Sequence, residues 1–197
     1  MKQRVSALAL LVFFLSLVSC SKDNTTAGTD IAGTYKFVSL QAKTTSTVQS
    51  VSGADVTKTV TTSDYTTINN SGTVKIDATQ FISTNLGYSI NSTAKSTIYD
   101  NGAVVDTLSF PLQFTVPSTS GTSTYKRAGA DSLYFSAGSL LVGGSSSAAQ
   151  SGGAKIKYEN GKLTLYNNTV QATVTRNQGE TVTNLASATI ITTLQKQ

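Results

Sequence analysis

This chain of 197 residues lacks histidine and tryptophan altogether, and it has only one cysteine and two prolines. Without histidine, the usual general base and the commonest nitrogen ligand for zinc are both missing. The single cysteine, Cys20, has no second cysteine with which to form a disulfide. We therefore expect no disulfide, no metal site and no cofactor.

Carboxylates are the catalytic groups that remain. Glu159 and Glu180 both stand beside turn residues, where exposure to solvent is the ordinary state. No serine lies in the strand-turn-helix motif that presents a nucleophile. We therefore expect that the protein is not an enzyme and has no catalytic residues. The sequence leaves one alternative open, because two carboxylates brought together by the fold could form a glycosidase pair.

Charged residues are also scarce, at 13% of the chain against about a quarter in typical soluble domains. The 15 basic residues outnumber the 10 acidic ones, but they are scattered along the chain. Nucleic-acid-binding proteins concentrate such residues in one patch or stripe. We therefore expect no nucleic-acid partner, and the length suits one ordinary domain, which we expect to be a monomer.

The N-terminus has the order of a secretory signal. Lys2 and Arg4 precede the uncharged, mainly apolar residues 5–18, and the small residue Ser19 follows. This run is shorter than the roughly 17 to 25 residues that a membrane-spanning helix needs. A basic segment, an apolar segment and a small residue at the cleavage site define a signal peptide. We predict a helical signal peptide over residues 1–19.

Leu17-Val18-Ser19-Cys20 resembles the lipobox of bacterial lipoproteins. The resemblance implies cleavage before Cys20 and attachment of acyl chains such as palmitate to this residue. The next residues, Ser21-Lys22-Asp23-Asn24, are similar to the export tag of Bacteroidota lipoproteins, which implies the cell outer membrane and its surface. Several acyl chains hold a protein on a membrane far more firmly than one chain does. We expect a lipidated tether over residues 20–30.

Residues 31–197 are predicted to form a single all-β domain. Threonine, valine, isoleucine, tyrosine and phenylalanine favour strands. A first strand is expected at residues 30–40, with Tyr35 and Phe37 on one face and Val38 and Leu40 on the other. One helical turn is expected at residues 64–70 and a loop at residues 117–130. Pro111 lies inside a strand pattern, which favours an edge or a bulge and places this strand at a seam of the sheet.

Tight hairpins are predicted where turn residues separate alternating segments. These turns are Asp100-Asn101-Gly102, Asn160-Gly161 and Asn177-Gln178-Gly179, and glycine or asparagine accepts the positive φ that such turns require. The pattern predicts about eight to ten strands in an antiparallel up-and-down barrel, with a β-sandwich as the alternative.

The Gly33-Thr34-Tyr35 triplet in "GTYKFVSL" resembles the G-x-W signature that opens lipocalin barrels, with tyrosine in place of tryptophan. The resemblance implies that Gly33 and Tyr35 help to close the barrel with a basic side chain, for which Arg176 is the candidate. It also implies that the barrel binds a small apolar or amphipathic ligand. The expected inward residues are Tyr35, Phe37, Phe110, Phe114 and Leu165. The alternative is that these side chains simply fill the interior.

A second functional hypothesis is a surface adhesion or assembly module, a sandwich that binds glycan or protein through its many hydroxyl groups. Asp106-Thr107-Leu108 and Asp131-Ser132-Leu133 are similar to the acceptor motif for O-glycosylation in Bacteroidota. Thr107 and Ser132 are therefore candidate glycosylation sites.

Overall fold

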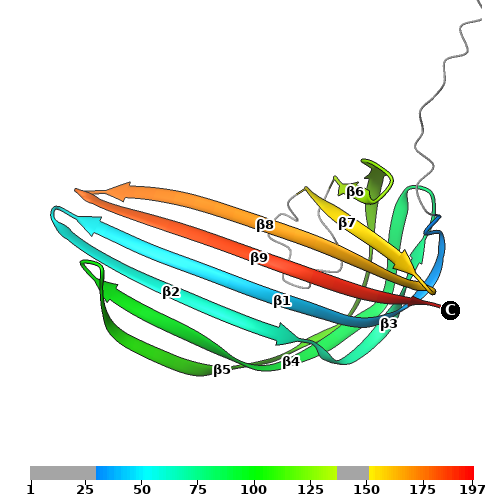
Figure 1. The fold of residues 1–197 in the computed structure, drawn as a ribbon, viewed down its shortest axis with the longest axis horizontal. Coiled ribbons are helices and arrows are strands. Elements are labelled where there is room, and N and C mark those ends of the chain that lie inside the picture. Colours follow the sequence, from blue (N-terminus) through cyan, green and yellow to red (C-terminus); the bar gives the residue numbers. More distant parts are fainter. Residues whose placement is uncertain (1–29, 137–150) are drawn as a thin grey trace, which may run out of the picture.

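A computed structural model describes residues 30–136 and 151–197. The predicted signal peptide, Cys20 and most of the tether lie outside the described residues. Nine β-strands account for almost all of the rest, and they are drawn in Figure 1. The strands are β1 (Gly33–Ser52), β2 (Asp55–Thr66), β3 (Ile68–Ile76), β4 (Gln80–Asp100), β5 (Ala103–Arg127), β6 (Ser132–Phe135), β7 (Gly152–Glu159), β8 (Lys162–Asn177) and β9 (Glu180–Lys196).

All nine strands belong to one antiparallel sheet, which confirms the all-β prediction. Their order is β2-β1-β3-β4-β5-β6-β7-β8-β9, and β1 also pairs with β9, so that the sheet closes in a ring. β2 and β3 follow one another between β1 and β4, because each pairs with both of those strands over a different part of their length. The sandwich alternative requires two separate sheets, and this arrangement has one.

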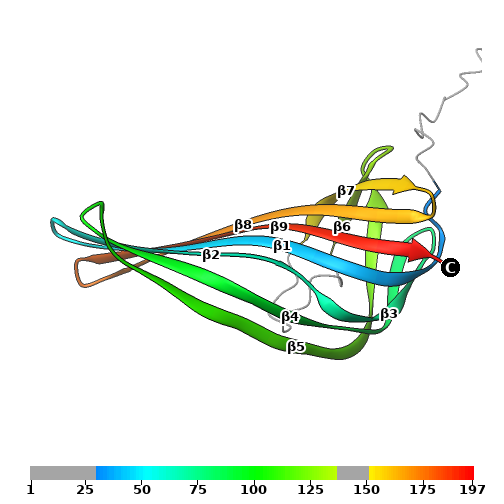
Figure 2. The ribbon, with the colours of Figure 1, turned by 60° about the horizontal axis from the view of Figure 1, so that its bottom comes forward.

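The ring is complete at one end of the sheet only. β6 and β7 are short, with 4 and 8 residues, whereas β5 and β8 have 25 and 16. Beyond β6 and β7, six strands continue toward the three hairpin tips, which join β1 to β2, β4 to β5 and β8 to β9 (Figures 1 and 2). Their order is β5, β4, β2, β1, β9 and β8. We call these two parts the ring end and the open half.

β5 forms one edge of the open half. It meets β6 only at residues 125–127, so Pro111 stands where β4 is its only strand neighbour among the described residues. A proline has no N–H to donate, and an edge tolerates that loss. The prediction of an edge strand at Pro111 is confirmed.

The predicted hairpin turns are confirmed by the backbone. Asn101 and Gly102 have φ of 46° and 85°, Asn160 and Gly161 have 51° and 74°, and Gln178 and Gly179 have 45° and 90°. Two successive residues with positive φ form the turn whose twist matches that of the flanking strands. These turns connect β4 to β5, β7 to β8 and β8 to β9.

The predicted faces of the first strand are partly wrong. Tyr35 and Phe37 share the buried face, but Leu40 is buried on that face as well, and Val38 is 41% exposed. The register against β9 shifts between Phe37 and Ser39, so Val38 is the extra residue of a β-bulge. A bulge moves the following residues to the other face, because side chains alternate along a strand.

The helical turn predicted at residues 64–70 is also wrong. The chain there ends β2 and begins β3, and Thr67 stands at the junction. The backbone N–H of Thr67 donates to the Leu40 carbonyl at 2.9 Å, and the Leu40 N–H donates to Thr67 Oγ1 at 2.9 Å. These long-range bonds keep the junction extended. The loop predicted at residues 117–130 is likewise mostly strand, because β5 continues to Arg127.

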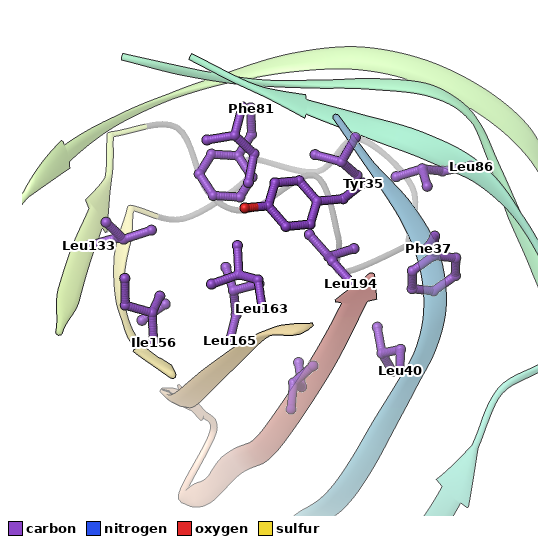
Figure 3. Packing of buried hydrophobic residues seen from close by; sticks show 14 of the residues in the cluster. Tyr35, Phe37, Leu40, Phe81, Leu86, Leu133, Ile156, Leu163, Leu165 and Leu194 are labelled. Atoms are coloured by element: carbon purple, nitrogen blue, oxygen red, sulfur yellow. The ribbon is translucent and has the colours of Figure 1, made fainter. Parts of the chain in front are cut away.

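The hydrophobic core fills the ring end. Its largest fully buried side chains come from β1, β3, β4, β6, β8 and β9, together with Ile31 just before β1. Figure 3 shows the Tyr35 ring pointing into the middle of this cluster. We call the face that bears the core the inner face. The inner face continues into the open half, where every second residue of each strand belongs to it.

Candidate ligand-binding face

Three of the five predicted ligand-binding residues lie in the packed core. Tyr35, Phe37 and Leu165 are 0%, 2% and 0% exposed. Phe37 meets Tyr88 with ring centroids 6.1 Å apart, and Tyr35 meets Tyr158 edge-on at 6.5 Å. The edge-on arrangement of Tyr35 and Tyr158 is a favourable one for aromatic rings. These three residues fill the interior, as the alternative interpretation expected.

A second aromatic group completes the ring end. Phe81 lies 5.0 Å from Tyr125 and 5.3 Å from Phe135, measured between ring centroids. The Tyr125 hydroxyl donates to the Asp77 carbonyl at 2.8 Å. The Asp77 carboxylate accepts the N–H groups of Thr79 and Gln80, which lowers the pKa of that carboxyl. The ring end is therefore a structural plug.

Tyr35 has its polar atom satisfied within this plug. Its hydroxyl donates to the Ile31 carbonyl at 2.8 Å. Burial, and then the neighbouring Tyr158, raises the pKa of Tyr35 to about 12. The phenol is therefore neutral at physiological pH and acts as a hydrogen-bond donor.

The basic residue beside Tyr35 is Lys196, and the prediction of Arg176 is wrong. Arg176 pairs with Thr181 at a hairpin tip, whereas Tyr35 pairs with Lys196. Thr181 and Lys196 stand at opposite ends of β9, roughly 50 Å apart at about 3.3 Å per residue. Lys196 Nζ lies 6.0 Å from the Tyr35 ring centroid and 5.9 Å from that of Tyr158.

Gly33 is part of the same arrangement. It has φ of 142°, and a Cβ at this position would lie 2.7 Å from Lys196 Cε. The glycine therefore leaves the space that the lysine stem occupies. The sequence did contain a signal for Lys196, because Thr192 and Leu194 before it alternate inward in the last strand. Register, which the sequence does not reveal, was needed to place it against Tyr35.

The other two predicted ligand-binding residues lie on the inner face of the open half. Phe110 and Phe114 stand opposite Ala94 and Ile90 of β4, both of which are buried. Phe110 and Phe114 are themselves 41% and 47% exposed, and Leu108 on the same face is 50% exposed. Large apolar side chains that gather in the open commonly mark a binding surface.

These side chains form a continuous row along β5, which we call the apolar flank. Leu112 and Val116 are partly buried and pack against the core, so the row runs from solvent down to the plug. The sequence singled out the two phenylalanines but missed Leu108, although the same alternation contains it. The members of the apolar flank are Leu108, Phe110, Leu112, Phe114 and Val116.

The other edge of the inner face is polar. The inner residues of β8 beyond the ring end include Thr169, Thr173 and Thr175, all exposed. Thr173 stands opposite Asn184 of β9. We call these four residues the polar flank. The middle strands contribute hydroxyl pairs, such as Thr44 Oγ1 with Ser63 Oγ at 2.7 Å.

Charged side chains lie mainly on the outer face. Lys43 and Asp64 form an ion pair there at 3.0 Å, and Lys157 pairs with Glu159 at 3.0 Å. The hydrogen bond and charge of Glu159 raise the pKa of Lys157. On the inner face of the open half, the charged residues stand near the hairpin tips; they are Asp55, Asp100, Asp106 and Glu180.

Shallow depressions also mark the outer face. One of about 400 Å³ lies over β1, β2 and β4 between Lys43 and Lys95. Another of about 520 Å³ lies over β4 and β5, where Gln113 Nε2 donates to Asn91 Oδ1 at 2.8 Å. Both include Thr93 in their lining and both are open to solvent, and the second also includes Phe110 of the apolar flank.

The two candidate glycosylation sites differ in accessibility. Thr107 is exposed on β5 next to the apolar flank. Ser132 is partly buried at the start of β6, and its hydroxyl donates to Asp131 Oδ1 at 3.0 Å. Thr107 is therefore the more accessible of the two hydroxyls.

Within residues 30–136 and 151–197, no three side chains of His, Cys, Asp or Glu gather as they would around a metal ion. In the same ranges, no helix has the length and hydropathy needed to cross a membrane. Comparison with known proteins finds no matching family model, no matching curated protein and no matching solved structure.

Proposed function

We propose that this protein is a bacterial cell-envelope lipoprotein whose lipocalin-like domain binds a small apolar or amphipathic ligand on the inner face of its open half. The observation that carries the proposal is the exposure of Leu108, Phe110 and Phe114 on the face that elsewhere forms the core. Full burial of such a side chain from water is worth about 1.5–3 kcal/mol, so covering the exposed half of one under a ligand gains about half of that.

The topology supports the lipocalin-like part of the proposal. Consecutive strands are neighbours in the sheet except β2 and β3, which lie one after the other between β1 and β4, and the first and last strands pair with each other. An up-and-down barrel has this order. The start of β1 also meets the end of β9 in the way that the lipocalin signature implies. A glycine, an aromatic ring and a basic side chain lie together there; they are Gly33, Tyr35 and Lys196.

The lipobox-like segment at Cys20 supports anchoring in the outer membrane. The described chain begins at Asp30, beside the ring end, where Ile31 is buried in the core. A lipid on Cys20 would therefore be tethered to the ring end, and the hairpin tips stand at the far end of the sheet (Figure 1). This arrangement leaves the apolar flank accessible to a ligand.

A fluorescent probe tests the ligand-binding proposal. The protein from residue 20 onward, with Cys20→Ala so that its own acyl chains do not compete, is titrated with N-phenyl-1-naphthylamine. Phe110→Ser with Phe114→Ser should weaken binding at least about tenfold, which corresponds to about 1.4 kcal/mol. The matched control is Val170→Ser with Val174→Ser, since these exposed valines lie on the outer face of β8. Equal losses in both variants would contradict the proposal.

A second candidate function is an assembly module that binds another protein. The outer face of β8 and β9 carries four exposed apolar side chains. They are Tyr166, Val170, Val174 and Leu185. Cross-linking in cells tests this function. A protein partner that is cross-linked to the Phe110/Phe114 variant should be lost from the Val170/Val174 variant.

A further inference from the structure

One edge of the open half is unprotected. β8 pairs with β7 only as far as Asn167, so from residue 168 to residue 177 its only strand neighbour among the described residues is β9. The unused N–H and C=O groups of such an edge can pair with a further strand. This stretch contains no proline, and Arg176 near its end is its only charged residue. Nothing in its sequence therefore opposes the addition of a strand.

The opposite edge, on β5, is protected. Both prolines of the chain, Pro111 and Pro117, lie in β5. Asp100 and Ala103 flank a two-residue turn and so exchange hydrogen bonds, and bonded pairs alternate with non-bonded pairs along an antiparallel ladder. By this alternation Pro111 stands in a non-bonded pair, with its nitrogen at the free edge. A strand that approached β5 would find no donor there.

The same alternation shows which groups of β8 are unused. Asn177 and Glu180 flank the turn between β8 and β9, so the odd-numbered residues of β8 bond to β9. Lys162 flanks the turn between β7 and β8, which agrees, because the even-numbered residues then bond to β7. Beyond the end of β7, the even-numbered residues direct their N–H and C=O groups to the free edge. They are Asn168, Val170, Ala172, Val174 and Arg176.

We propose that two copies of this chain pair through these edges, β8 against β8 in antiparallel orientation, so that the two open halves form one continuous sheet. A two-fold axis perpendicular to the sheet at Ala172 gives this arrangement and keeps both inner faces on the same side. Ala172 then stands opposite itself, and Val170 stands opposite Val174 of the second copy. In this register all five residues with unused groups have a partner. A shift by two residues in either direction would leave some of them without one.

The side chains are self-complementary in this register. Val170 and Val174 are 68% and 50% exposed on the outer face, and the dimer brings them together as β-branched pairs. On the inner face, Thr169 meets Thr175 of the second copy, hydroxyl beside hydroxyl. Both kinds of pair stabilise neighbouring strands. A second copy of this chain therefore fits the β8 edge.

The charges and the other edge favour the same pairing. Arg176 meets the uncharged Asn168 of the second copy, so no like charges face each other. A pairing that uses β5 would lack the donor that Pro111 cannot supply, and β5 against β8 would add molecules in an open row. Only β8 against β8 closes into a dimer. The length of the chain, from which we expected a monomer, carries no information about this edge.

The inference goes beyond the proposed ligand binding and does not depend on it. β8 and β5 are opposite edges of the open half, so the dimer leaves the apolar flank uncovered. A monomeric variant should therefore bind the naphthylamine probe as tightly as the dimer does.

Single cysteines test the register. Cys20→Ala removes the only cysteine, so Ala172→Cys in this protein places one thiol at the two-fold axis. The Cα atoms of a bonded pair are about 5.5 Å apart, within the range of a disulfide. Two copies of residue 170 would be four residues apart along the strands, about 13 Å, which is too far.

Non-reducing gel electrophoresis during mild oxidation measures the cross-linking. Ala172→Cys should form disulfide-linked dimers at least about tenfold faster than Val170→Cys, although Val170 is well exposed. Combining Val170→Cys with Val174→Cys places thiols opposite each other again and should restore fast cross-linking.

A proline tests whether the unused backbone groups are needed. In sedimentation velocity the Cys20→Ala protein should be a dimer. Ala172→Pro removes a donor that faces the free edge but leaves the bonds to β9 in place, so this variant should be a monomer. Ser109→Pro is the matched control, because residue 109 stands in a non-bonded pair of β5 as Pro111 does, and it should remain a dimer.

The outcomes are distinct. A monomeric Cys20→Ala protein, or equal cross-linking at residues 170 and 172, would overturn the inference, while the naphthylamine titration judges ligand binding separately. A dimer that survives Ala172→Pro would show that its copies do not pair through β8. If the proline variant does not fold, the cross-linking rates decide, because residues 170 and 172 are exposed and tolerate cysteine.

Discussion

Lys196 lies against the ring of Tyr35, with its Nζ 6.0 Å from the ring centroid, and the same Nζ donates a hydrogen bond to the Ala32 carbonyl at 2.9 Å. The last strand is thereby connected to the segment that precedes the first strand. β1 and β9 pair over their whole length from this point. The two residues hold together the seam at which the sheet closes.

Replacing Lys196 should weaken this seam. Lys196→Met keeps most of the aliphatic stem but loses the charge and the hydrogen bond, and we expect the free energy of unfolding to fall by about 1 kcal/mol. Urea denaturation measures the change. Lys126→Met, at an exposed position on β5, is the control and should change stability by less than about 0.5 kcal/mol. Equal effects of the two substitutions would show that the seam contact contributes nothing.

Adding a side chain at Gly33 should disturb the same contact. The Cβ of Gly33→Ala would meet Lys196 Cε at 2.7 Å, and φ of 142° is a conformation that alanine rarely adopts. We expect a loss of about 2 kcal/mol in unfolding free energy. Gly153→Ala is the control, because its Cβ would be 3.8 Å from the Leu133 carbonyl, an ordinary contact. Thermal unfolding of both variants tests this expectation, which an unchanged midpoint for Gly33→Ala would overturn.

Stability should depend on alkaline pH through Tyr35. Its pKa is raised to about 12 in the folded protein from 10.0 when unperturbed, so the unfolded state loses this proton first. The resulting stabilisation is fully present below pH 10 and disappears as the pH rises through 12. Urea denaturation from pH 8 to 12 should show that the free energy of unfolding falls with pH, and that it falls less steeply in Tyr35→Phe. Below pH 10 the same variant should be less stable by about 1 kcal/mol, because the Ile31 carbonyl loses its donor.

The proposed lipid anchor can be tested in the cell. Cys20→Ala removes the thiol that the proposed modification requires, so the protein should move from the membrane fraction to the soluble fraction of the envelope. Fractionation and immunoblotting measure this. Ser21→Ala retains the cysteine and should stay with the membrane, and wild-type levels of Cys20→Ala in the membrane would refute the anchor.

Several features of the fold follow from local chemistry and were predictable. Asn101-Gly102 and Asn160-Gly161 form tight turns because these residue types accept positive φ wherever they stand. Pro111 could be assigned to an edge because its missing N–H excludes it from the middle of a sheet. The alternation that placed Phe110 and Phe114 on one face is likewise a property of a single strand.

Other features depend on how distant segments pair. The bulge at Val38 moves Leu40 to the inner face, and nothing in the neighbouring residues signals it because it appears only in the register with β9. The same register, and not proximity in sequence, selects Lys196 over Arg176 as the partner of Tyr35. Thr67 is extended because it bonds to Leu40, 27 residues away.

The sequence by itself thus determined the strand class, the turns and the alternation of apolar side chains, because each is fixed by the conformational preferences of a residue and its neighbours. Only the tertiary structure decided that Tyr35, Phe37 and Leu165 fill the ring end while Phe110 and Phe114 lie open. The reason is that β6 and β7 are too short to cover the inner face of β5 and β8, and which strands cover a side chain is set by pairing between distant parts of the chain.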